Sequence, residues 1–312
     1  MSLPLAYLDQ NVVSLQSTGV IDFSGVSGVQ WVYSKEHFAE ISRSDNPGPF
    51  WDALDQLSAQ LLDLEMVGWE LTGRVNLVEG GTAYAHYQDY QDANADVEVD
   101  EGIFSLFIAW SLGGATPEML RELPDRFAGQ LQRLMARLPE DIANLIPAGV
   151  EDDLRDMVDN MSEQGNDIVR LRELLGVGKG AAGSIVGENP LAQIWELAAP
   201  NVAGLSAEQF YHFSSLEEEK AQPITWLGII GCCMALDIVG YKSEKKARKP
   251  ERVPNILSDA AHIAAGAYCS LLVSRDRRLV ERAKAIYQFR GISTEVAYLE
   301  LDGESSVEGA SD

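Results

Sequence analysis

Both ends of the chain carry short apolar runs that alternate with segments of helical periodicity. An apolar run over residues 5–8 stops at Asp9, and a second run over residues 29–33 precedes Ser34, which can cap a helix. The C-terminal pattern predicts helices over residues 224–239 and 258–268, a strand over 271–274, a helix over 279–289 and a strand over 294–301. Strands that alternate with helices in this way are typical of an α/β fold.

The middle of the chain has a different pattern. Apolar residues recur about every 3.6 positions over residues 50–64, 117–138 and 154–175, which predicts helices. Residues 69–78 fit either a hairpin or an extended arm, and the pattern does not decide between them. We therefore expect a three-layer α/β/α fold with a central, mainly parallel sheet that is interrupted by a largely helical insertion.

This pattern divides the chain into four segments. Residues 1–48 and 221–301 form the two halves of the predicted sheet domain, and residues 49–220 form the helical insertion. Within the second half, Ser258 or Asp259 is expected to cap its helix. Residues 302–312 are acidic and have little to bury, so we expect a disordered tail.

Composition describes an ordinary globular protein. The chain has 312 residues, and 46% of them are hydrophobic, which is enough for a sizeable core. No apolar run approaches the roughly 20 residues of a bilayer span, and the N-terminus lacks the pattern of a signal peptide, so we expect a cytoplasmic protein without membrane contact. The three cysteines have no metal-site spacing, and buried reduced thiols are the better interpretation.

Charge is unevenly distributed along the chain. The formal net charge of -24 argues against a polyanionic ligand, because nucleic-acid binding depends on Lys and Arg contacts to phosphates. Residues 242–290, however, hold 12 basic residues against 5 acidic ones. Three of these cations, Lys245, Lys246 and Arg248, form either a solvated loop or a phosphate contact, and both interpretations stay open.

Four acids occupy positions suited to metal chemistry. Asp9 ends the first predicted strand, Glu40 lies on the helix after the second, Asp259 opens a later helix and Asp276 follows the strand over residues 271–274. In open α/β sheets, the carboxyl edge of the strands is the usual place for a site. Carboxylate oxygens are the ligands that hard cations prefer, so the sequence predicts a Mg²⁺ or Mn²⁺ site for phosphodiester cleavage.

The polar neighbours of these acids each fit more than one role. Asn11 and Ser274 can orient a ligand or phosphate, or simply shape a loop and a turn. His262 is either a donor to the site or an ordinary helix histidine. Arg275 beside Asp276 is interpreted as a phosphate contact because it lies in the basic stretch.

Three blocks of sequence resemble the PIN-domain nucleases. Residues 7–14 (YLDQNVVS) resemble the opening strand with its first acid, and residues 32–41 (VYSKEHFAEI) resemble the second strand and the helix with the catalytic Glu. The stretch over residues 259–296 is similar to the third and fourth acid blocks and the final strand. The resemblance covers roughly residues 3–45 and 224–300. It implies that Asp9, Glu40, Asp259 and Asp276 ligate one or two Mg²⁺ or Mn²⁺ ions in an endoribonuclease whose partner is RNA rather than DNA.

Two other functions remain open at this stage. The acidic helical insertion could bind a protein partner, as in a toxin-antitoxin pair, and the chain would then be a catalytically silent regulatory or interaction protein. Alternatively, the same four acids could serve a structure-specific DNA nuclease, because no short motif reveals contacts to the 2′-hydroxyl.

Overall fold

The computed structural model of the chain describes residues 3–67, 70–94, 101–136, 149–178, 180–213, 224–243 and 249–301. The first elements in chain order are β1 (Leu5–Leu8), α1 (Gln10–Ser17), β2 (Gln30–Ser34), α2 (Lys35–Ser42), α3 (Gly48–Gln56), β3 (Gln60–Val67), β4 (Glu70–Val78) and α4 (Ala83–Asn94). The middle elements are α5 (Glu101–Ser111), α6 (Pro117–Arg121), α7 (Leu123–Met135), α9 (Val150–Gln164), α10 (Ile168–Leu174), η1 (Ala182–Ser184), α11 (Pro190–Ala198), η2 (Ala199–Asn201) and α12 (Ala207–Phe210). The last elements are α13 (Trp226–Val239), η4 (Pro250–Arg252), α14 (Val253–Gly266), β5 (Leu271–Ser274), α15 (Arg277–Arg290) and β6 (Glu295–Tyr298).

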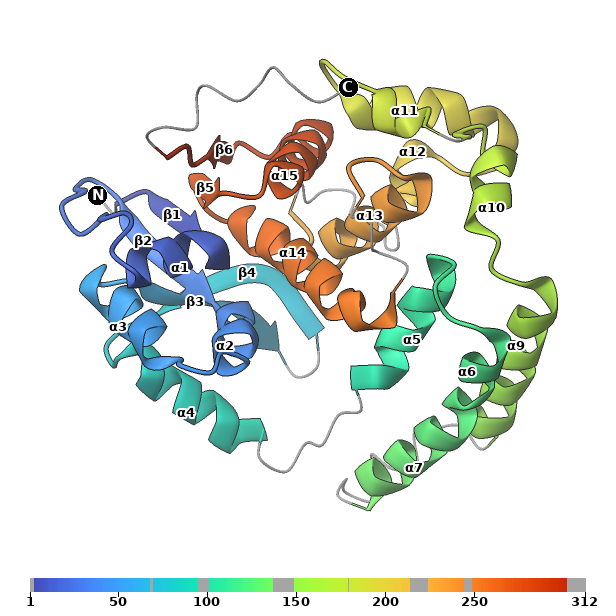
Figure 1. The fold of residues 1–312 in the computed structure, drawn as a ribbon, viewed down its shortest axis with the longest axis horizontal. Helices are drawn as coiled ribbons and strands as arrows, with labels where there is room; N and C mark the ends of the chain where they lie inside the picture. The colour runs from blue at the N-terminus through green and yellow to red at the C-terminus, as the bar shows by residue number, and fades with distance from the viewer. Residues whose placement is uncertain are drawn as a thin grey trace.

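Strands from both ends of the chain form one mostly parallel sheet, as predicted. The strand order is β4-β3-β2-β1-β5-β6, and all neighbours are parallel except β3 and β4. Strand β1 lies inside the sheet, where Ala6 is in register with Trp31 of β2 and with Leu271 of β5. The first and last segments of the chain therefore pair directly, and Figure 1 shows them side by side.

Helices cover both faces of this sheet. Alternate strand residues point to opposite faces, so each strand contributes to two cores. Ala6, Leu8 and Tyr33 belong to a core with residues of α1, α2 and α3. Tyr7 and Val32 belong to a second core with residues of α13, α14 and α15. The fold is mixed α/β, with its main hydrophobic cores above and below one sheet.

The expected start of the helical insertion at residue 49 is wrong. Strand β3 pairs with β2 in parallel, and β4 pairs with β3 antiparallel, so residues within 60–78 extend the sheet. Residues 69–78 were expected to form a hairpin or an extended arm, whereas residues 70–78 form the single strand β4, which pairs with β3. The strand was missed because Leu54, Leu57, Leu61 and Leu64 repeat at helical spacing, while the first two belong to α3 and its end and the last two to β3.

Helix α14 begins earlier than predicted. It starts at Val253, with Pro254 in the first turn, and Arg252 occupies the N-cap position. Neither Ser258 nor Asp259 caps the helix, and both lie in its middle. The predicted helix ends at Gly240 and Gly291 are confirmed, because both glycines adopt the left-handed conformation that closes a helix.

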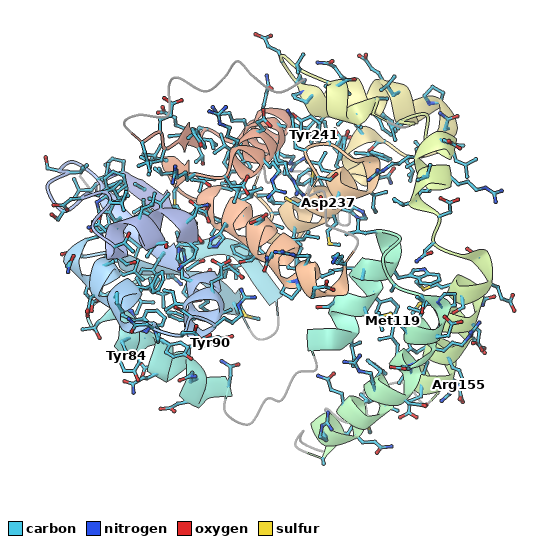
Figure 2. The ribbon with its side chains drawn as sticks, in the orientation of Figure 1. Tyr84, Tyr90, Met119, Arg155, Asp237 and Tyr241 are labelled. Atoms are coloured by element: carbon cyan, nitrogen blue, oxygen red, sulfur yellow. The ribbon has the colours of Figure 1, made fainter. Side chains whose placement is uncertain are left out.

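A third hydrophobic cluster lies in the helical part of the chain. It joins α5, α6 and α9 with the first turns of α14. Figure 2 labels Met119 of α6 and Arg155 of α9 in this region, away from the sheet. The helical expectation is confirmed for this part, while Lys245, Lys246, Arg248 and the predicted tail over 302–312 fall outside the described residues.

Candidate functional site

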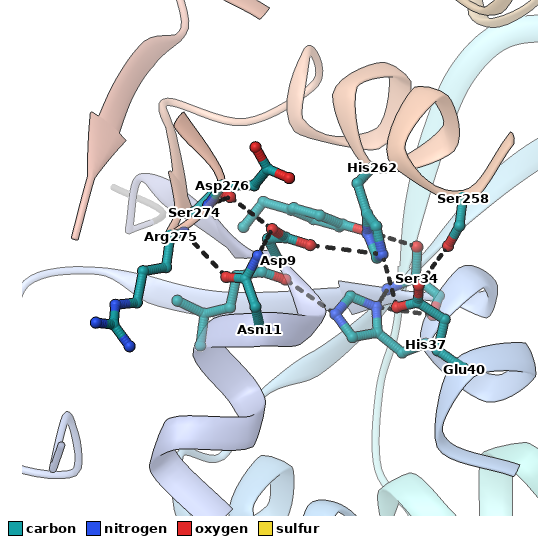
Figure 3. A network of polar contacts seen from close by, with 12 residues as sticks. Asp9, Asn11, Ser34, His37, Glu40, Ser258, His262, Ser274, Arg275 and Asp276 are labelled. Carbon is teal, nitrogen blue, oxygen red and sulfur yellow. Dashed lines mark hydrogen bonds and ion pairs between the residues drawn. The ribbon is translucent and has the colours of Figure 1, made fainter. Parts of the chain in front are cut away.

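Two of the predicted acids meet where β1 and β5 end. Asp9 follows β1 directly, and its backbone N–H donates to the carbonyl of Val273 at 3.0 Å. Asp276 follows β5 and caps α15. Because β1 and β5 are parallel neighbours, their carboxyl ends lie at the same edge of the sheet, and Figure 3 shows both acids there.

Asp9 is buried and held by two side chains from opposite ends of the chain. Its Oδ2 accepts hydrogen bonds of 2.5 Å from the Ser274 hydroxyl and from the Asn11 side-chain amide. The Asn11 carbonyl oxygen in turn accepts the backbone N–H of Arg275 at 2.9 Å. Asn11 and Ser274, predicted near the site, therefore fix the orientation of Asp9, and Arg275 contributes a backbone contact.

His262 connects Asp9 to Glu40. Its Nε2 lies 3.0 Å from Oε2 of Glu40 and 3.7 Å from Oδ1 of Asp9. Its Nδ1 lies 2.7 Å from the Tyr7 hydroxyl. The other Glu40 oxygen accepts the Ser258 hydroxyl at 2.6 Å. Both oxygens of Glu40 are thus hydrogen-bonded, and Figure 3 shows this chain of contacts.

This pair carries a buried charge. Burial alone would lower the pKa of His262, but the hydrogen bond to Glu40 and the negative charges of Asp9 and Glu40 outweigh it and raise the pKa to about 9. Burial acts against the charged form of Glu40 too, yet the hydrogen bond and charge of His262 lower that pKa to about 2. At neutral pH the site therefore contains an imidazolium paired with the Glu40 carboxylate, next to Asp9, whose pKa is raised by burial.

The Tyr7 hydroxyl continues the network to Ser34. It lies 2.7 Å from the Ser34 hydroxyl, and burial raises the pKa of Tyr7 well above its usual value. Ser34 also caps α2 in a reciprocal pair with His37, as its position in the sequence predicted. The chain of hydroxyls therefore ties His262 to the first turn of α2, the helix that carries Glu40.

His37 has a structural role. Its Nδ1 accepts the backbone N–H of Ser34 at 3.2 Å, and its Nε2 lies 2.9 Å from the carbonyl of Leu8, to which it donates. Burial and the nearby charge of His262 lower the pKa of His37 to about 3. The neutral ring joins the end of β1 to the start of α2, so it positions the segments that carry Asp9 and Glu40.

Asp259 lies in a different environment from Glu40. It is one helical turn before His262 on α14, and no hydrogen bond from another described residue reaches its carboxylate. Burial and the negative charges of Asp9 and Asp276 raise the pKa of Asp259 to about 7, against the opposing charge of Arg282. Three of the four predicted acids therefore lie within electrostatic reach of one another.

Asp276 is partly neutralised by its own helix. Its Oδ1 accepts the backbone N–H of Arg278 at 2.7 Å, and its Oδ2 accepts the Arg278 guanidinium at 3.0 Å. Burial opposes the charged form, but these contacts with Arg278 outweigh it and lower the pKa of Asp276. A cavity of about 460 Å³ opens beside this acid, lined by Asn11, Arg275, Asp276, Arg277 and Tyr298.

A buried ion pair between α15 and α13 lies within electrostatic reach of Asp259. Arg282 of α15 donates to Asp237 of α13 at 2.9 Å and to the carbonyl of Cys233 at 2.6 Å. Asp237 and Arg282 have almost no solvent exposure, with side chains 1% and 5% exposed. Asp237 lies on the apolar helix α13 and is paired with Arg282, whose charge also acts on Asp259.

The carboxylates of the cluster are the ligand type that a hard cation prefers. The described residues do not, however, surround a cation-binding position with three or more such ligands. Among the described residues, no group of three or more His, Cys, Asp or Glu side chains is placed to hold a metal ion in common. Mg²⁺ is commonly held by only one or two carboxylates together with substrate phosphates and water. Asp9 and Asp259 or Asp276 offer that smaller set, although hydrogen bonds already reach both oxygens of Asp276 as well as both oxygens of Glu40.

Three contacts were not recognised from the sequence. Ser258 was expected to cap a helix, but its hydroxyl holds Glu40. Tyr7 was included only as part of an apolar strand, and Arg278 was not distinguished from its basic neighbours. Helical spacing from Ser258 to His262 was the one available signal, since residues four apart share a face of a helix.

No protein-family model, curated protein or solved structure matches this chain. Within the described part of the chain, no helix has both the length and the hydropathy required to span a bilayer.

Proposed function

We propose that the protein is a metal-dependent endoribonuclease of the cytoplasm with a PIN-like fold. The observation that carries this proposal is that Asp9 and Asp276 follow neighbouring parallel strands at the carboxyl edge of the sheet, with Asp259 of α14 within electrostatic reach of both. These acids come from three separate segments, and burial together with the charges of Asp9 and Asp276 raises the pKa of Asp259. A carboxylate cluster of this kind is stabilised when a cation binds.

Asp9, Asp259 and Asp276 would hold Mg²⁺ or Mn²⁺ jointly with a substrate phosphate. When bound, the metal supplies Lewis-acid activation of the phosphate and of an attacking water. Asn11 and Ser274 hold the Asp9 carboxylate in one orientation through hydrogen bonds of 2.5 Å. Burial and the charges of Asp9 and Asp276 raise the pKa of Asp259 to about 7, and a bound cation would favour loss of its proton by offsetting those charges.

Glu40 and His262 have a positioning role in this proposal. The imidazolium of His262 offsets the charge of Asp9 at 3.7 Å, and Glu40 keeps that imidazolium protonated. This differs from the expected role of Glu40 as a direct ligand. On the other side of Asp276, the cations that line the cavity of about 460 Å³ are suited to a phosphate of the nucleic acid.

A cleavage assay tests the proposal. Purified protein is incubated with end-labelled single-stranded RNA or DNA, with Mn²⁺ or with EDTA, next to an Asp9→Asn, Asp276→Asn double variant. We expect RNA cleavage that needs Mn²⁺ and falls more than about 100-fold in the double variant, since even outer-shell changes cost roughly 10- to 100-fold. Asp45→Asn changes an exposed aspartate outside the cluster and serves as the control.

Cleavage that survives in the double variant would refute the site, and cleavage of DNA alone would favour the structure-specific DNA nuclease. Absence of cleavage would favour the catalytically silent interaction protein. That second candidate has a specific observation in its favour, because His262 and Arg278 already neutralise Glu40 and Asp276. A protein partner of the acidic helical region remains a prediction. It is motivated by three acids in the first turn of α9, namely Glu151, Asp152 and Asp153.

A further inference from the structure

We propose that a cavity next to Glu40 binds one unpaired base of the nucleic-acid substrate, together with its adjoining phosphate. The cavity has a volume of about 700 Å³ and lies between α2, β3, α4 and the first turns of α13 and α14. Its size is within the roughly 300–1,000 Å³ of typical small-molecule sites. This inference rests on the proposed function and adds the substrate class, which is a nucleic-acid strand with at least one unstacked base.

The cavity adjoins the acid cluster directly. Its wall contains Ala39, the chain neighbour of Glu40, and Leu257, the chain neighbour of Ser258. Glu40 and Ser258 are joined by a hydrogen bond of 2.6 Å, so the cavity borders the two helices that this bond connects. The smaller cavity beside Asp276 lies at the other end of the cluster, so a bound strand has a place on each side of the carboxylates.

Two aromatic side chains give the cavity a surface for stacking. Tyr90 of α4 is 39% exposed, and its ring contacts Phe38 of α2 at a centroid distance of 5.5 Å. Trp226 at the start of α13 is half-buried and lines the same cavity. Unpaired bases are recognised by stacking on aromatic rings, and stacking tolerates any base because every base has a π-face.

Two cations of α2, Lys35 and Arg43, border the same space, and so do the acids Glu36 and Asp63. Arg43 is exposed, and its Nε donates to the carbonyl of Ala39 at 3.0 Å, while its terminal nitrogens have no partner among the described residues. Lys35 makes an ion pair of 2.6 Å with Asp63 on β3. Arg43 is thus the side chain best placed to meet the phosphate that accompanies the base.

The overall charge makes stacking important here. A chain with a net charge of -24 repels a polyanion, and only a few Lys and Arg residues flank the acids. Affinity must then come more from base contacts than from phosphate contacts. Accordingly, binding is expected to depend weakly on salt compared with proteins that neutralise many phosphates.

Binding of a short oligonucleotide tests the proposal without any cleavage. The probe is a fluorescein-labelled adenosine hexaribonucleotide, its deoxy counterpart serves for comparison, and fluorescence anisotropy is recorded in EDTA. We expect Tyr90→Ala to weaken binding of both probes by about 5- to 20-fold, as the loss of one stacked base does. Arg43→Ala should weaken binding by a smaller factor of about 2 to 5.

Tyr84→Ala is the matched control. Tyr84 lies on the same helix and is 48% exposed, but it packs against Trp51 and does not line the cavity. Figure 2 labels the two tyrosines, Tyr90 near α2 and Tyr84 further along toward α3. This variant should change binding less than about 2-fold. Circular dichroism and melting curves of both variants verify that they remain folded.

The binding and cleavage assays together distinguish failure of this inference from failure of the proposed function. Equal binding by the Tyr90→Ala and Tyr84→Ala variants overturns the inference and leaves the cleavage assay unaffected. A Tyr90 effect confined to the RNA probe also overturns it, because the residue would then read the sugar. A selective Tyr90 effect on both probes in a protein that cleaves nothing supports the inference and rejects the nuclease. Failure of the wild type to bind either probe overturns the inference, and the cleavage assay with Mn²⁺ then reports on the nuclease separately.

Discussion

Glu40 and Asp259, on two sides of the acid cluster, differ in how their negative charge is compensated. On the side of α2, Glu40 is hydrogen-bonded by Ser258 and His262, and the imidazolium is buried with it. On the side of α15, Asp259 faces the charges of Asp9 and Asp276 with no hydrogen bond from another described residue. The pKa of Glu40 is lowered, whereas the pKa of Asp259 is raised.

This difference indicates which half depends on a ligand. A carboxylate that is paired inside the protein gains nothing from an added cation, and its removal leaves the partner charge uncompensated. A carboxylate that lies near other anions is destabilised by repulsion, and a bound cation reduces that repulsion. The same chemical change, the loss of one negative charge, should therefore have opposite effects on stability in the two halves.

Glu40→Gln should give the largest effect. The substitution leaves the buried imidazolium of His262 without its main partner, so the free energy of unfolding should fall by about 3 kcal/mol. Urea denaturation at pH 7 in EDTA measures the change through the transition midpoint. Glu36→Gln on the same helix is the control, and a loss of equal size there would contradict the specific pairing.

The pH dependence of stability should reveal the same pair. The pKa of His262 is about 9 in the folded protein against an ordinary value of 6.5, so its stabilisation is complete below pH 6.5 and is lost as the pH rises through 9. We expect about 2 to 3 kcal/mol to disappear between pH 7 and 10. Comparison with His262→Gln isolates this contribution, and parallel curves for the two proteins would rule it out.

Asp259→Asn should increase stability when no divalent ion is present. Its pKa is raised to about 7, so the wild type loses stability as Asp259 ionises between pH 4 and 7, while the variant does not. Since the residue is only partly buried, we expect a gain of about 1 to 2 kcal/mol at pH 8 and none near pH 3. A variant less stable than the wild type at pH 8 would mean that Asp259 has a favourable partner.

Millimolar Mn²⁺ should raise the melting temperature by a few degrees. Binding to the folded state alone adds about 1 to 2 kcal/mol at moderate saturation, which corresponds to roughly 1.5 to 3 °C for a chain of this size. Differential scanning calorimetry measures the shift in the wild type, in Glu40→Gln and in Asp259→Asn. The shift should persist in the first variant and shrink in the second; an equal shift in both would place the cation elsewhere.

The sequence predicted the sheet from its ends but not its full width. Strands β1, β2 and β5 are short apolar runs next to capping residues, a local pattern that needs no tertiary information. Strand β3 was read as helix because its leucines continue the spacing of the preceding helix. Pairing with β2 decides its structure, and pairing between distant segments is not encoded in local periodicity.

The positions of Asp9 and Asp276 were predictable from the sequence, but the pairing of Glu40 with His262 was not. Asp9 and Asp276 end strands, and parallel strands bring their ends together, so their proximity follows from topology. The role of His262 depends on distances of 3.0 Å to Glu40 and 2.7 Å to Tyr7, which spacing along the chain cannot give. The residues Lys245, Lys246 and Arg248 lie outside the described part, so their phosphate contact stays a prediction.

The interior place of β1 in the sheet has a consequence for how the protein is made. One neighbour of β1 begins at Gln30, but the other, β5, begins only at Leu271. At typical elongation rates of about 5–20 residues per second, the ribosome needs roughly 13 to 50 seconds between Asp9 and Ser274. Until then β1 has an open edge and Asp9 lacks its hydroxyl partner, so the nascent chain carries no assembled acid cluster. For the ribonuclease proposed above, this timing would keep the growing chain inactive beside the messenger RNA that encodes it.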